Sequence, residues 1–433
     1  MYNIRYTISM DYSKTTLDNG LKVITVPMPS LESVTVTVWV KTGSRNENSK
    51  NSGISHFLEH MFFKGTTNRP TAKQIAEEID QIGGVQNAGT AKEYTEYYIK
   101  CRADKAEVAY DLLSDMTLNS LLDATEIERE KGTIIEEIRM YEDTPMINIG
   151  EVFEGLIYSG HTLEMDIAGT EKTVGGMKRQ NFLDYRTNFY TPTNMILTVA
   201  GGITEKESVD LAKKYFSKLV TRNSSLVVKP FENSQKEPKI KLHNKKKEQT
   251  HVILGFLADG KNYKNKYAQT ILSTILGGGM SSRMFIEVRE RRGLAYSIRT
   301  SMDRYTDIGY LGTYAGLDTK RAEEAVRVML DEHYKTINNK APITSQELTK
   351  AKEFLKGHLA LALEDTSDVS SFFGDQELFS EKVLTPEEVF KKIDKVTMEE
   401  VNFEANRLFV PERLNLAIIG PYENDSKFKK IIS

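Results

Sequence analysis

The order of predicted elements occurs twice along the chain, and this duplication constrains the fold more than any other feature. The first copy has strands at 21–26, 34–41, 93–101 and 194–203, and helices at 53–63, 71–84, 104–122 and about 125–142. The second has strands at 251–258, 309–316 and 413–421, and helices at 266–278, 319–337 and 344–364. A repeat of roughly two hundred residues predicts two similar domains. Short strands mixed with long helices indicate an α+β fold, with helices packed on one face of a mostly antiparallel sheet in each domain.

A polar stretch separates the two copies. The sequence "TRNSSLVVKPFENSQKEP" at 221–238 carries two prolines and has few apolar residues. Such composition is typical of a linker. We therefore predict a first domain at 1–220, a linker at 221–238 and a second domain at 239–433. A chain of 433 residues is also too long for one hydrophobic core.

Composition excludes several classes of protein. A net charge of −3 gives no electrostatic reason to expect a nucleic-acid partner. The single cysteine, Cys101, excludes an internal disulfide and a cysteine-rich metal site. The apolar run at 34–40 is too short to span a bilayer, and the first twenty residues contain no apolar signal segment. We expect a cytoplasmic protein without a membrane span.

Two histidines share one predicted helical turn with a glutamate. The sequence "SHFLEHMFFKGT" at 55–66 places His56 and His60 four residues apart, with Glu59 directly before the second. On a helix the two imidazoles lie about 40° apart, so both can reach one metal ion at about 2.0–2.1 Å. Glu59 lies one step round the helix, better placed to contact water at the metal than to bind the metal. The face expected to pack consists of Phe57, Leu58, Met61 and Phe62.

A catalytic zinc ion has three protein ligands, and a second helix offers candidates for the third. Glu130 and Glu137 are seven residues apart, so they lie within about 20° of each other on the helical wheel. Both border an apolar stripe that should face inward, formed by Ile127, Ile134 and Ile138. Glu136 falls on the opposite side and should be solvated. Of the adjacent pair Glu136 and Glu137, the second is therefore the ligand candidate.

Each of these residues also has a structural interpretation without function. The two histidines could be hydrogen-bonded polar residues on an ordinary amphipathic helix that lines a crevice. Glu130 and Glu137 could be plain surface carboxylates. The five-residue pattern alone does not decide between these readings, and the carboxylates in a matching context favour the zinc site.

The same residues resemble the inverzincins, the zinc metallopeptidases of the pitrilysin, insulin-degrading and mitochondrial processing peptidase family. The resemblance extends over nearly the whole chain and includes "HFLEHMFFKGT", "EREKGTIIEEI", "YTPTNMILTVAG" and "GGGMSSRMFIEVRERRGLAYSI". It implies that His56, His60 and Glu137 bind one zinc ion per chain. Glu59 would be the catalytic base. Glu130 would match a supporting acidic residue of the family's site, in a role that the sequence leaves open.

The resemblance also assigns residues in the second half. In the family, an arginine and a tyrosine seven residues apart hold the substrate backbone and help to stabilise the transition state. Arg289 and Tyr296 in "EVRERRGLAY" have this spacing. Without the resemblance, Arg289 would be interpreted as a solvated helix residue and Tyr296 as half-buried in a strand. The corresponding helix of the second copy, "AQTILSTIL", contains no histidine, so we expect one metal site.

The segment "GGVQNAGTAKEYT" at 83–95 resembles the family's edge strand, along which the substrate lies as an added β-strand. Asn87 and Ala88 would contact the substrate backbone through unpaired groups of the sheet edge. Gly89 departs from the family, because many relatives carry a bulky apolar residue there. This departure leaves the residue preference beside the scissile bond open.

The resemblance implies a zinc endopeptidase that hydrolyses peptides or unfolded polypeptide segments. Family enzymes enclose a chamber with four such domains, so a two-domain chain should dimerise. A homodimer is the simplest expectation, and a heterodimer with another subunit stays open. One alternative is a non-catalytic scaffold or partner subunit, and another is a regulatory zinc-binding module. The retention of all four zinc-site residues, together with Arg289 and Tyr296, favours the peptidase.

Overall fold

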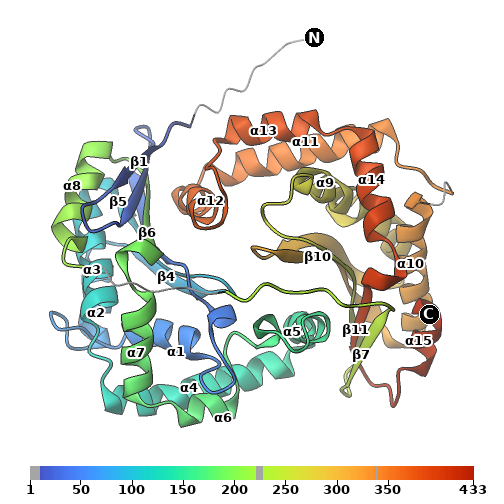
Figure 1. Cartoon of the computed structure of the whole chain (residues 1–433), viewed down its shortest axis with the longest axis horizontal. Coiled ribbons are helices and arrows are strands. Elements are labelled where there is room, and N and C mark those ends of the chain that lie inside the picture. The colour runs from blue at the N-terminus through green and yellow to red at the C-terminus, as the bar shows by residue number, and fades with distance from the viewer. Residues whose placement is uncertain (1–9, 221–227, 338–339) are drawn as a thin grey trace. The chain divides into compact units, whose positions relative to one another are not determined.

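The computed structural model describes residues 10–220, 228–337 and 340–433 (Figure 1). The chain forms two compact units, each assembled from separate stretches of sequence. The first unit combines Met1–Arg139, Met165–Val228 and Ala360–Glu387, and the second combines Met140–Glu164, Lys229–Leu359 and Glu388–Ser433, as far as these ranges are described. The domain boundaries at 220 and 239 stay a prediction, and residues 221–227 of the predicted linker lie outside the described residues.

The first unit is built on a six-stranded sheet in the order β1-β2-β6-β3-β5-β4. Only β2 and β6 are parallel neighbours, and the other pairs are antiparallel. Its strands are β1 (Ser13–Thr16), β2 (Lys22–Pro27), β3 (Ser33–Val40), β4 (Val85–Thr90), β5 (Thr95–Arg102) and β6 (Met195–Gly201). Its helices are α1 (Ile54–Phe62), α2 (Ala72–Gln81), α3 (Ala106–Asn119), most of α4 (Ala124–Asp143), α6 (Glu171–Gly176), α7 (Arg179–Phe189), α8 (Glu205–Phe216) and α12 (Thr366–Phe379).

The second unit contains a five-stranded sheet in the order β7-β11-β8-β10-β9, in which only β7 and β11 are parallel neighbours. Its strands are β7 (Lys239–Asn244), β8 (Gln249–Asp259), β9 (Ala295–Arg304), β10 (Ile308–Asp318) and β11 (Leu414–Gly420). Its helices include α5 (Pro145–Ile157), α9 (Lys266–Gly277), α10 (Ala322–Ile337), most of α11 (Ser345–Ala362), most of α13 (Pro386–Lys395), α14 (Met398–Leu408) and α15 (Ser426–Ile432). The two sheets with their helices confirm the α+β class.

Each sheet also carries a helix from a remote part of the chain. In the first unit, α3 and α8 lie on one side of the sheet and α12 on the other (Figure 1). Helix α12 lies within the second copy in sequence, yet Thr366 and Ser370 bond Thr35 and Thr37 of β3 at 2.8 Å. In the second unit, α5 packs on β11, β8 and β7 although it precedes that copy. Helices therefore cover both faces of the first sheet, which adds to the predicted arrangement.

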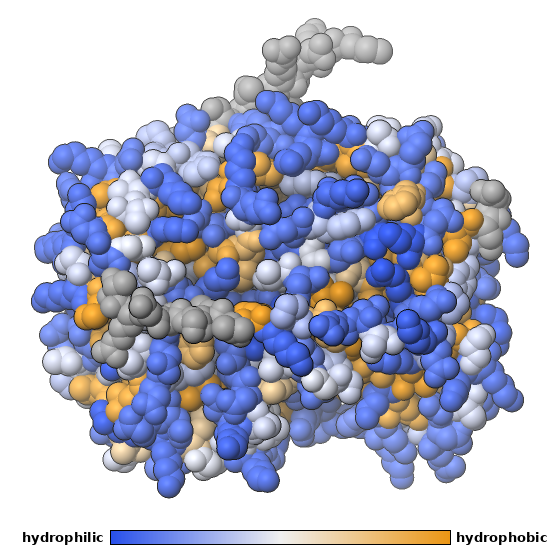
Figure 2. All heavy atoms as spheres, in the orientation of Figure 1, coloured by the Kyte–Doolittle hydropathy of each residue, from blue (hydrophilic) through white to orange (hydrophobic). Residues whose placement is uncertain are grey.

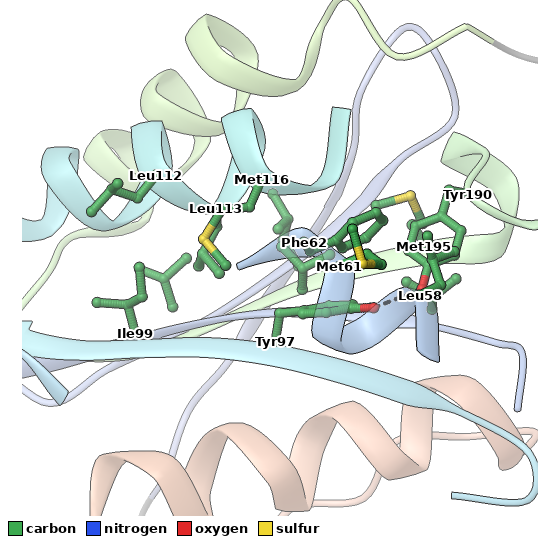
Figure 3. Close-up of a cluster of buried hydrophobic side chains, with 14 of the residues drawn as sticks. Leu58, Met61, Phe62, Tyr97, Ile99, Leu112, Leu113, Met116, Tyr190 and Met195 are labelled. Carbon is green, nitrogen blue, oxygen red and sulfur yellow. Dashed lines mark hydrogen bonds between the residues drawn. The ribbon is translucent and has the colours of Figure 1, made fainter. Parts of the chain in front are cut away.

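Helix α1 is fixed to the first sheet by its apolar face. Leu58, Met61 and Phe62 are buried against β5 and α3 (Figure 3). Phe62 packs on the ring of Tyr97, whose hydroxyl bonds that of Tyr190 at 2.8 Å. Burial of such side chains stabilises the fold by about 1.5–3 kcal/mol each. This packing sets the rotation of α1 and therefore the direction of its polar face.

No helix among the described residues is both long and apolar enough to cross a membrane. On the face visible in Figure 2, hydrophobic residues occur in small groups between hydrophilic ones.

Candidate metal centre

The N-terminus of α1 is held by a buried carboxylate. Glu47 accepts hydrogen bonds from the backbone N–H groups of Gly53 at 2.7 Å and Ser55 at 2.8 Å. These groups have no partner within the helix, so Glu47 satisfies them and its charge suits the helix N-terminus. Burial nevertheless raises the pKa of Glu47 to about 7, against the lowering effect of these bonds. The carboxylate thus fixes where α1 begins, just before His56.

Helix α4 presents its carboxylates as the helical wheel predicts. Ile127, Ile134 and Ile138 are buried, which confirms the inward stripe. Glu130 is buried and Glu137 half-buried beside this stripe. Glu136 is exposed and bonds Arg139, which confirms that it is solvated.

Three predicted ligands converge in the first unit. One ligand atom each from His56, His60 and Glu137 lies within 4.8 Å of the others. The Nε2 atom of His56 is 3.7 Å from Glu137 Oε1, and that of His60 is 3.6 Å from Glu137 Oε2. These separations are too long for hydrogen bonds. They approach the spacing of about 3.3 Å between two ligands of a tetrahedral zinc ion at about 2.0–2.1 Å.

Glu130 orients one of the histidines. Its Oε1 atom lies 2.9 Å from Nδ1 of His60, and its Oε2 atom lies 2.6 Å from Nζ of Lys64. A carboxylate on Nδ1 leaves Nε2 as the nitrogen that can bind a metal, an arrangement common around zinc ligands. Two cationic or donor partners lower the pKa of Glu130 although burial opposes them. The lowered pKa favours the ionised form of Glu130, which is paired with Nδ1 of His60.

The two histidines are electrostatically unequal. Burial and the neighbouring His60 lower the pKa of His56 to about 4. Burial also lowers the pKa of His60, but its bond to Glu130 and the charges of Glu137 and Glu59 outweigh burial and raise it. The Nδ1 atom of His56 is buried without a hydrogen-bond partner among the described residues. The donor set of two imidazoles and one carboxylate is one that zinc accepts, so the residues fit this ion.

Glu59 lies beside the ligands in a buried position. Its Oε2 atom accepts a hydrogen bond from Oγ1 of Thr90 on β4. Burial raises the pKa of Glu59, and the charge of Glu137 adds to this effect, whereas Thr90 and His60 oppose it. A carboxylate with a raised pKa is a stronger base near neutral pH. Thr90 also ties this carboxylate to the strand at the sheet edge.

Strand β4 is the terminal strand of the first sheet, as the resemblance implied. It pairs with β5 on one side, and no other described strand pairs with it. Asn87 is exposed, and Ala88 and Gly89 are half-buried. The unpaired side of β4 is therefore available to an added strand.

Arg289 and Tyr296 lie in the second unit. Arg289 belongs to a π-helical segment, Phe285–Glu290, and Tyr296 to β9. The guanidinium of Arg289 lies 5.8 Å from the centre of the Tyr296 ring, within the range of a cation–π contact. Tyr296 is 77 % exposed, and the half-buried position expected without the resemblance is wrong.

Three residues around the site were not predicted from sequence. Thr90 bonds Glu59, Lys64 bonds Glu130, and Glu47 bonds the start of α1. Lys64 carried a usable signal, because it lies four residues after His60, just beyond the end of α1. Thr90 and Glu47 carried none, since they meet α1 only through the folded arrangement.

Two family models match this chain. The model described as "Insulinase (Peptidase family M16)" matches residues 22–171, and "Peptidase M16 inactive domain" matches residues 176–355. The "Uncharacterized zinc protease YmxG" of Bacillus subtilis (strain 168) is 37% identical over 94% of this chain and 98% of its own length. An "Uncharacterized zinc protease" of Rickettsia felis is 36% identical over 94% of this chain and 96% of its own length.

Solved structures share the fold. "The crystal structure of a protease from Helicobacter pylori" matches with a TM-score of 0.89 and 24% identity, covering 95% of this chain and 100% of that one. A structure titled as a peptidase M16 inactive domain from Pseudomonas fluorescens matches with a TM-score of 0.87 and 18% identity, covering 95% and 98%.

Proposed function

The chain belongs to peptidase family M16, and from that premise we propose that it is a zinc-dependent endopeptidase. Its substrates are peptides or unfolded polypeptide segments. One zinc ion binds per chain through His56, His60 and Glu137. The names of the relatives, which call them zinc proteases, support this metal.

The observation that carries the proposal is the convergence of two helices on one point. Helix α1 brings His56, Glu59 and His60, and α4 brings Glu137 to within 4.8 Å of the imidazoles. A purely structural role for Glu59 would not explain why its carboxylate is buried beside these groups. Three ligands with an adjacent base are the parts that metal-assisted hydrolysis requires.

Each side chain has a defined task. Zinc, when bound, polarises the scissile carbonyl and makes water a better nucleophile. Glu59 takes the proton of the attacking water and passes it to the leaving amine. Thr90 holds the Glu59 carboxylate by its hydrogen bond, and Glu130 holds His60. Glu130 is thus a positioning residue.

The substrate lies as an added strand along β4. Asn87 and Ala88 bond its backbone, and the hydrogen bond from Thr90 to Glu59 ties this strand to the base. Arg289 and Tyr296 hold the substrate backbone and the developing oxyanion, as in the family. Removal of one oxyanion donor elsewhere lowers kcat by about 100- to 1,000-fold, and Tyr296→Phe should do the same here.

The active form is a dimer that encloses a chamber, a homodimer in the simplest case. Each chain contributes a catalytic domain at 1–220 and a second domain at 239–433. A cytoplasmic location remains a prediction that cell fractionation tests.

The alternative is a non-catalytic scaffold or partner subunit. The name of the family model that matches 176–355, an inactive domain, suits the second half, which has no histidine pair on α9. It does not describe the first half, where the ligands and the base are intact. A regulatory zinc site would need neither Glu59 nor the pair of Arg289 and Tyr296.

The test is zinc-dependent cleavage of a quenched-fluorescence peptide library. Treatment with a chelator should abolish cleavage, and one equivalent of zinc per chain should restore it. The variant His56→Ala, treated in the same way, should neither cleave nor regain activity with zinc. Wild-type protein that holds zinc and cleaves no peptide would favour the scaffold.

A further inference from the structure

A row of cross-strand neighbours ends at the free edge of β4. Trp39 of β3 pairs with Glu96 of β5, and Glu96 pairs with Gly89 of β4. Side chains in such a row point to the same face of the sheet. The next residue, Tyr97, is buried against α1, so Glu96 points to the opposite face, because side chains alternate along a strand.

Glu96 is a partly buried carboxylate without a partner. It makes no hydrogen bond and no ion pair with another described residue. Lys100, which alternation places on the same face of β5, is bonded to Asp365 at 2.6 Å. Burial and the charge of Glu59 raise the pKa of Glu96 to about 7. A cation that reaches the Glu96 carboxyl group would stabilise its ionised form.

Gly89 leaves the carboxylate uncovered on the side of the free edge. A Cβ atom built at Gly89 would lie 3.8 Å from Oε1 of Glu96, in ordinary contact. A bulky side chain there would extend over the carboxylate, whereas glycine has nothing to place over it. Gly89 has no left-handed backbone angle, so conformation does not require glycine at this position.

An added strand would continue the row beyond Gly89. The substrate residue opposite Gly89 would lie two strand spacings, about 10 Å, from Glu96. The side chain of a glutamate and that of a lysine or arginine are together long enough to span this distance, because the glycine between them has no side chain. Glu96 and Asp375 both lie near enough to Tyr94 to act on it electrostatically.

We propose that Glu96 and Gly89 form an acidic subsite that selects a lysine or arginine side chain of the peptide beside the scissile bond. This proposal rests on the proposed peptidase function and names the substrate class of that site. Glu96 accepts the charged hydrogen bond of the substrate cation, and Gly89 provides the passage to it. Hydrogen bonds to charged groups contribute enough to change affinity by about 10- to 150-fold.

The experiment uses quenched-fluorescence peptides that differ at a single residue. Lysine, methionine or glutamate is placed in turn at each position around the cleavage site. Methionine is the neutral comparison for lysine, because both side chains are long and unbranched. The ratio of kcat/KM for the lysine and methionine peptides is measured for wild type, Glu96→Gln, Gly89→Phe and Glu77→Gln. Glu77 is an exposed carboxylate on α2 that pairs only with Lys73, so its variant is the matched control.

At one position the wild type and Glu77→Gln should prefer lysine by about tenfold or more. The variants Glu96→Gln and Gly89→Phe should lose this preference while still cleaving the methionine peptide. The two variants act at different residues, so misfolding of one leaves the other as the test. Cleavage with an unchanged lysine preference in both would overturn the subsite alone. A wild type that cleaves none of the peptides would overturn the peptidase function, and the subsite with it.

Discussion

Glu130 holds one of the two imidazoles through a hydrogen bond to its Nδ1 atom. Its bonds to His60 and Lys64 explain why a carboxylate so deeply buried remains ionised. The helical wheel placed it next to Glu137, yet sequence could not separate ligand from support, because both lie on one side of α4. The distinction depends on distances of a few ångströms between helices.

Replacing Glu130 by glutamine should weaken zinc binding. The amide oxygen still accepts a hydrogen bond from His60, but it lacks the negative charge of the carboxylate and holds the imidazole less strongly. Loss of a supporting residue of this kind typically lowers metal affinity by about 10- to 100-fold. Competition with a chelating dye measures the change. Glu136→Gln, on the exposed side of α4, should leave the affinity unaltered. Equal affinity in both variants would show that Glu130 does not position His60.

The unequal histidines predict the pH dependence of zinc binding. The raised pKa of His60 means that a proton competes with zinc there as the pH falls, whereas His56, with a pKa of about 4, is already neutral. Affinity should therefore decrease with falling pH, with release of about one proton per zinc ion between about pH 5 and 6.5, where His60 is protonated and His56 is neutral. Calorimetry in buffers of different ionisation enthalpy counts these protons. Release of two protons near pH 6 would contradict the assignment.

Helices α1 and α4 could be predicted from sequence because each has a strong apolar period. The same period placed His56 and His60 on the polar face of α1, and Glu137 beside the buried stripe of α4. Helices α5 and α12 were not predicted. Their positions depend on sheets that lie far away in sequence, and periodicity carries no information about which sheet a helix joins. Thr90 was missed for the same reason.

The start of α1 requires glycine at position 53. Gly53 has a φ of 92°, and a Cβ atom there would lie 2.5 Å from the carbonyl oxygen of Ala168. Gly53→Ala should lower the free energy of unfolding by more than about 2 kcal/mol, because overlap adds to the cost of about 1–2 kcal/mol for the left-handed conformation. Urea denaturation measures the loss.

Gly83→Ala is the matched control for this substitution. Gly83 also has a positive φ, of 61°, but no atom lies within 4 Å of its added Cβ. Only the conformational cost of about 1–2 kcal/mol should remain. Equal losses in the two variants would argue that the contact with Ala168 does not restrict position 53.

At the scale of the whole molecule, one chain carries two sheets and one candidate metal centre in the described residues. The duplication was visible in sequence because the element order repeats. The interleaving of the two compact units was not, since it depends on the segments 140–164 and 360–387, whose partners lie in the other half of the chain.

The dimer proposal predicts a particle of twice the chain mass of 49.1 kDa. Light scattering during size-exclusion chromatography measures this mass directly, and dilution should lower peptidase activity together with the dimer fraction. A fully active monomer would remove the need for a chamber formed by two chains.

The most direct test of the central claim is the peptidase rate of Glu59→Gln, with bound zinc determined in the same sample. Glutamine keeps the shape of the side chain but cannot accept the proton of the attacking water. We expect one zinc ion per chain, as in the wild type, and a loss of cleavage of at least about 100-fold. Undiminished cleavage by a zinc-loaded Glu59→Gln variant would contradict the assignment of the base and the mechanism built on it.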